Sequence, residues 1–136
     1  MKSVVPVKPL FICLLLVFSV SCLKLKGEFA LKFAMQDSYR RITAPVQINK
    51  NETVQWLYQL DTMPSQKVQI GIILLKKEVI WVDVLVQDDI IGMDVNVVYG
   101  TIKDLDEGQY RLVLTDVKKN AEIDSFEFTV YSDDAY

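Results

Sequence analysis

VQIGIILL (residues 68–75) and VIWVDVLV (residues 79–86) are two apolar runs separated only by Lys76, Lys77 and Glu78. Each run is rich in β-branched residues and has the length of an ordinary strand. The pair therefore predicts two neighbouring β-strands joined by a short charged turn. In the second run we expect one face, made of Ile80, Val82, Val84 and Val86, to enter the core, with Trp81 and Asp83 pointing outward together.

Alternation of apolar and polar residues extends this pattern over the rest of the chain. It recurs in residues 29–35, 54–60, 95–99, 110–114 and 126–130, and polar turns separate these segments. No long stretch shows the 3.6-residue period of an amphipathic helix. The sequence predicts an all-β domain, an antiparallel β-sandwich of seven or eight strands over residues 28–131, followed by a polar tail at 132–136.

The N-terminal segment has the features of an export signal. Lys2 and Lys8 flank an apolar run of 11 residues, LFICLLLVFSV at 10–20. As a helix this run would be roughly 16 Å long, well short of the hydrocarbon core of a bilayer. Residues 1–21 are therefore predicted to be a signal peptide, followed by an anchor or linker at 22–27.

Ser21-Cys22 resembles the bacterial lipobox, in which cleavage exposes a cysteine that is then acylated. The resemblance implies attachment to membrane lipid through Cys22, and the Leu23 that follows resembles lipoproteins released to an outer membrane. Ser19 and Ser21 also satisfy an ordinary signal peptidase, which would leave a secreted domain with a free thiol. We expect a protein of the bacterial cell envelope, with secretion as the alternative.

The segment LDEGQYRL (residues 105–112) resembles the corner before the penultimate strand of immunoglobulin-like and fibronectin type III-like domains. The resemblance covers residues 105–131. It implies that Tyr110 hydrogen-bonds back to the preceding corner, where Gly108 allows the tight backbone. Trp56 would fill the place that a core tryptophan often takes in such sandwiches.

The residue inventory argues against catalysis. The chain has no histidine, and Cys22 is its only cysteine after the export signal, which removes the commonest general base and the usual zinc ligands. Residues 22–136 contain 13 basic and 18 acidic residues, a net charge of −5, so nucleic acid is not an expected partner. We predict a non-enzyme without a cofactor.

Two acidic clusters are candidate calcium ligands, because Ca²⁺ requires several oxygen ligands: Asp88 with Asp89, and Asp104 with Asp106 and Glu107. Solvated turns are the favoured interpretation of both. Trp81 and Asp83 could form a contact patch for a sugar ring or a protein. The favoured interpretation is that a neighbouring loop covers Trp81 and that Asp83 caps a backbone amide. The expected function is a binding or structural module with an unknown envelope protein or glycan as partner. A carbohydrate-binding or calcium-dependent adhesive domain is the alternative.

Overall fold

The computed structural model describes residues 24–133, and this part of the chain is all-β. The strands alternate with turns and short loops, as the spacing of the apolar segments predicts. They are β1 (Gly27–Lys32), β2 (Arg40–Arg41), β3 (Val46–Asn49), β4 (Val54–Leu60), β5 (Val68–Lys77), β6 (Trp81–Ile91), β7 (Val97–Ile102), β8 (Gly108–Asp116) and β9 (Ala121–Tyr131). The described residues contain no helix that is long and apolar enough to cross a membrane.

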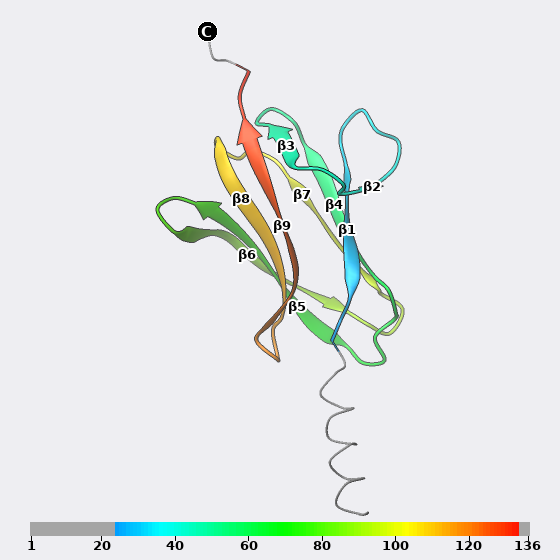
Figure 1. Ribbon diagram of the computed structural model, residues 1–136. Helices are drawn as coiled ribbons and strands as arrows, with labels where there is room; N and C mark the ends of the chain where they lie inside the picture. The colour runs from blue at the N-terminus through cyan, green and yellow to red at the C-terminus, as the bar shows by residue number, and fades with distance from the viewer. Residues whose placement is uncertain (1–23, 134–136) are drawn as a thin grey trace, which may run out of the picture.

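The strands form two sheets, which confirms the predicted β-sandwich. One sheet has four strands in the order β2-β1-β4-β7, and the other has five in the order β3-β9-β8-β5-β6. Neighbouring strands are antiparallel except β3 and β9, which are parallel. The structure has nine strands, more than the seven or eight expected, because two short segments also form strands (Figure 1). β2 pairs with β1, and β3 pairs with β9.

The core lies between the sheets and is built from alternate residues of each strand. In β4 the side chains of Val54, Trp56, Tyr58 and Leu60 are buried, while Gln55 and Gln59 face solvent. Aromatic rings join the layers. Phe29 of β1 contacts Phe126 of β9, with ring centroids 4.8 Å apart. These buried residues of β4 are the apolar ones that the sequence pattern predicts, because apolar and polar side chains must alternate in a strand that buries one face.

Trp56 is buried against a strand that makes room for it. Gly100 of β7 is its register partner, and a Cβ at that position would lie 2.8 Å from two atoms of the indole ring. Gly100 therefore leaves the space that the indole occupies.

Tyr110 is at the start of β8 and makes the contact expected at a tyrosine corner. Its hydroxyl donates to the backbone carbonyl of Asp106 at 2.7 Å. Its ring stacks on Phe128, with centroids 5.4 Å apart and planes 11° apart. Gly108 has φ of +150°, in the region that favours glycine. The hydrogen bond therefore ties the β7–β8 loop to the core-facing side of β8.

The prediction that Ile80, Val82, Val84 and Val86 face the core is wrong. All four side chains are exposed. The reason is the position of β6 at the outer edge of the five-stranded sheet, where the hairpin that it forms with β5 projects from the body of the sandwich (Figure 1). A register shift in this hairpin also places one extra residue, Val84, between the partners of Leu74 and Leu75. A branched run that would suit a central strand is thus found on an edge strand.

Candidate interaction surface on strand β6

Strand β6 presents a long open edge. It is 11 residues long, and in the part of the chain that the structure describes it pairs along its length with β5 alone. The Ile90 N–H donates to the Asp89 carboxylate at 2.8 Å, and the Gly92 N–H donates to the Val95 carbonyl at 2.6 Å, so both point away from β5. Because alternate residues of a strand point their N–H groups the same way, those of Val86 and Asp88 face the same edge. The edge therefore offers backbone donors to an added strand.

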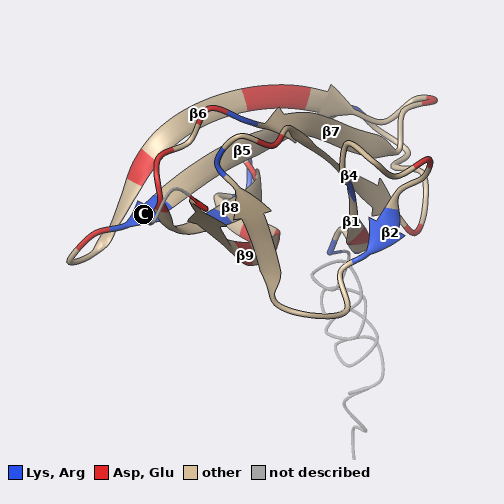
Figure 2. Ribbon diagram, turned by 90° about the horizontal axis from the view of Figure 1, so that it is seen from above, with Lys and Arg blue, Asp and Glu red and all other residues tan. Residues whose placement is uncertain are grey.

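Apolar side chains extend on both sides of this edge. Register places Val86 beside Ile73 on the outer face of the sheet, whereas Leu85 lies beside Leu74 on the inner face. Val86 is 60 % exposed, and at the turn before the strand Val79 is 99 % exposed. Figure 2 shows β6 running along the outside of the molecule from this turn toward β7. We call residues 79–91 the β6 edge.

Trp81 and Asp83 share the outer face, because they lie opposite Lys77 and Leu75 of β5. Trp81 is only half-buried, and the Arg111 guanidinium lies 4.8 Å from its ring centroid. Arg111 also forms an ion pair with Glu127. Protein groups therefore already contact this ring and hold its orientation, while Asp83 stays exposed.

The two acidic clusters do not form one site. Asp88 accepts a hydrogen bond from Gln69 Nε2 at 3.1 Å, and the adjacent Asp89 accepts from the Ile90 amide. Asp104, Asp106 and Glu107 lie instead in the loop between β7 and β8. Among residues 24–133, no group of three or more acidic side chains is close enough to hold a metal ion.

Two buried tyrosines have altered acidity. Burial, and secondarily the charge of Asp124, raises the pKa of Tyr58 to about 12. Burial also raises the pKa of Tyr110, although the nearby Lys76 ammonium opposes the shift. Both hydroxyls therefore stay protonated at neutral pH, as their positions in the core require.

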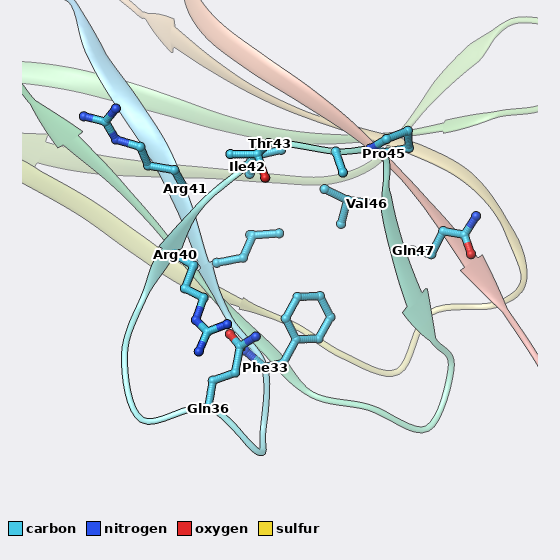
Figure 3. Close-up of a pocket in the computed structure, with 11 residues that line it drawn as sticks. Phe33, Gln36, Arg40, Arg41, Ile42, Thr43, Pro45, Val46 and Gln47 are labelled. Atoms are coloured by element: carbon cyan, nitrogen blue, oxygen red, sulfur yellow. The ribbon is translucent and has the colours of Figure 1, made fainter.

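A hollow of about 370 Å³ lies beside residues 40–47, the segment that contains β2 and the start of β3 and leads from one sheet to the other (Figure 3). Phe33 and Val46 contribute apolar surface, and Arg40 and Gln36 lie at its rim. The Gln36 side chain accepts a hydrogen bond from the Phe33 amide, so it closes the turn after β1. The hollow combines an apolar floor with two arginines, Arg40 and Arg41, whose side chains are exposed.

A larger groove of about 1000 Å³ lies at the end of the sandwich where β1 begins. Three segments line it: the residues before β1, the β4–β5 loop and the β8–β9 turn. The sequence analysis did not find this site, although a signal was present: its lysines flank predicted strands at positions 24, 26, 67, 118 and 119. Cys22, the predicted lipidation site, lies outside the described residues.

No protein-family model matches the chain, and no curated protein is significantly similar to it. Among solved structures, it is similar to a β-glucosidase from Listeria innocua in complex with gluconolactone, with 16 % identity and a TM-score of 0.41. The same enzyme in complex with glucose gives 14 % identity and a TM-score of 0.39. Each match covers 76 % of this chain but only 16 % of the length of the glucosidase. Similarities this weak do not indicate a shared function.

Proposed function

We propose that this chain is an exported, lipid-anchored envelope protein that acts as a non-catalytic binding module. The support for export and anchoring comes from the sequence: a basic start, an apolar run of 11 residues and the lipobox-like Ser21-Cys22. Two or more acyl chains on Cys22 would provide the stable attachment that a single chain does not.

We also propose that the domain belongs to the immunoglobulin-like class. The support is the division of the strands, in which β1 pairs with β4 and β4 with β7, while β9, β8, β5 and β6 form the opposite sheet. The Tyr110 contact with the Asp106 carbonyl provides independent support. Membership of a fold class does not by itself identify a binding partner, so the partner has to be inferred from the exposed surface.

The observation that carries the binding function is the exposed, apolar β6 edge. An unpaired edge with exposed branched side chains is a template for an added strand, and natural proteins usually block such edges unless they use them. In β-strand addition, main-chain hydrogen bonds provide affinity and alternate side chains provide specificity. We infer that the partner is an extended segment of another protein, which pairs along residues 84–91.

The charge of the β6 edge indicates which side chains the partner segment should carry. The β6 edge has three acidic residues, Asp83, Asp88 and Asp89, and no basic one. Opposite charges across a strand pair stabilise it by roughly 0.2–1 kcal/mol each, and like charges destabilise it. The favoured partner therefore has apolar residues alternating with lysine or arginine. A glycan is less favoured, because Arg111 already occupies a face of the Trp81 ring.

The test is a binding titration with two short labelled peptides, one alternating valine with lysine and the other valine with glutamate. Fluorescence anisotropy should show binding of the lysine peptide, which Val86→Pro weakens by removing an edge donor. The glutamate peptide controls for apolar binding alone. Equal binding of both peptides, or unchanged binding by a folded Val86→Pro variant, would rule out strand addition at this edge.

A further inference from the structure

We propose that the lysine-lined groove at the β1 end of the sandwich is a docking surface for anionic lipid headgroups. Five lysines line it, at positions 24, 26, 67, 118 and 119, together with a single acidic residue, Asp116. Asp116 is almost fully buried, and its carboxylate accepts a hydrogen bond from the Lys119 backbone amide. The charge that this end presents to solvent from the lining residues is therefore positive.

The concentration of lysine contrasts with the rest of the domain. The chain after the export signal is acidic, with 13 basic and 18 acidic residues, yet five of the basic ones meet here. Elsewhere in the domain, basic side chains pair with acidic ones, as Arg41 does with Glu28, Lys76 with Glu78 and Arg111 with Glu127. Like charges gathered in this way repel one another, so an external anion would relieve the repulsion.

The lysines come from three segments that are far apart in sequence. Lys24 and Lys26 precede β1, Lys67 precedes β5, and Lys118 lies in the β8–β9 turn. Figure 1 shows that these three places lie at the same end of the molecule, opposite the end of β9. The fold therefore assembles one basic face from separate turns.

Apolar side chains lie among the lysines. Met63 is 47 % exposed and Val117 is 40 % exposed, and Leu25 is half-buried between Lys24 and Lys26. A mixture of lysine and exposed apolar residues suits the boundary between lipid headgroups and acyl chains. It is less suited to a small soluble anion, which would leave the apolar residues without a contact.

The short sequence distance between the groove and Cys22 favours a membrane as the partner. The first described residue, Lys24, lines the groove and is two positions from Cys22. In this respect the inference rests on the proposed anchoring, because acyl chains on Cys22 would hold this end of the domain against the bilayer. The turn of the β5–β6 hairpin projects from the side of the sandwich, whereas the end of β6 pairs with the start of β5 beside the groove (Figure 1).

The test measures which lysines the membrane protects. The full chain, as a bacterial host produces it, is reconstituted on phosphatidylcholine vesicles with or without phosphatidylglycerol. A water-soluble acetylating reagent is then added, and mass spectrometry gives the reaction rate of each lysine. Lys50 and Lys103 are the matched controls, because they lie beyond β3 and β7 at the opposite end.

We expect Lys67 and Lys118 to react about fivefold more slowly on vesicles that contain phosphatidylglycerol, a factor typical of one lysine held near an anionic surface. The two control lysines should react at the same rate on both vesicles, and high salt should remove the protection. A Lys67→Gln/Lys118→Gln variant should lose the protection at Lys24 and Lys26, whereas Lys50→Gln/Lys103→Gln should keep it.

Equal rates for Lys67 and Lys118 on both vesicles would overturn the proposal, as would equal protection of all lysines. Failure of anchoring gives a different result: the chain would not be retained on phosphatidylcholine alone and its mass would show no acyl chains. Protection on anionic vesicles would still support the groove in that case, while absence of any binding to them would refute it.

Discussion

Removing one hydroxyl group from the core should measurably weaken this domain. In the wild-type protein the Tyr110 hydroxyl donates a hydrogen bond to the Asp106 carbonyl at 2.7 Å. Tyr110→Phe removes this donor but keeps the ring that stacks on Phe128. Loss of such a bond, with its acceptor left near the core, costs about 1–2 kcal/mol. For a domain of this size each kcal/mol lowers the melting temperature by about 4 °C, so a fall of about 4–8 °C is expected.

Urea unfolding followed by tryptophan fluorescence is the appropriate assay, because Trp56 is buried in the core. The midpoint should fall while the slope stays the same, since the surface exposed on unfolding is unchanged. Tyr99→Phe is the control, because Tyr99 is 69 % exposed on β7 and its loss should change stability by less than about 0.5 kcal/mol. If both variants unfold at the same urea concentration, the hydrogen bond of the corner does not stabilise the fold.

Three further predictions address the core and the edge. Gly100→Ala should destabilise the domain by about 1–3 kcal/mol in urea titrations and shift the emission of Trp56, because the new methyl group collides with the indole; unchanged emission and midpoint would contradict this packing. Because the pKa of Tyr58 is raised to about 12, the folded state keeps a proton between about pH 10 and 12 that the unfolded state has lost, so the free energy of unfolding should decrease as pH rises through this range. Calorimetry from pH 9 to 12 should show a shallower decrease for Tyr58→Phe, and identical slopes would refute the assignment. Val86→Pro should cost less than about 1 kcal/mol by thermal melting because its N–H faces the open edge, whereas Val113→Pro in the central strand β8 should cost about 3 kcal/mol or more; equal costs would show that Val86 donates to β5.

The sequence was sufficient to predict the sandwich, because most strands bury one face and so alternate. Phe29, Tyr58 and Phe128 all lie where the alternation places them. The prediction failed for β6, because a run of valines has the same composition in a central strand and in an exposed edge strand. Which of these it becomes depends on the pairing order of the sheet, and that order is a property of the whole chain.

The candidate site was only partly accessible from sequence for the same reason. Trp81 and Asp83 were correctly expected to share the outward face, since that follows from the two-residue period. The contact of Arg111 with the Trp81 ring could not be predicted. Arg111 belongs to β8, and strand β5 lies between β8 and β6 in the sheet. The lysine groove was missed because its members are separated by up to 95 positions and meet only at one end of the folded sandwich.

Anchoring at Cys22 determines the orientation of both proposed surfaces, so the most direct measurement is the intact mass of the protein made in a bacterial host, wild type beside Cys22→Ala. We predict a mature chain that begins at Cys22 and carries three acyl chains, and we predict that the substitution abolishes this species. An unmodified chain that begins at Cys22 or later would contradict the proposal and indicate a freely secreted domain.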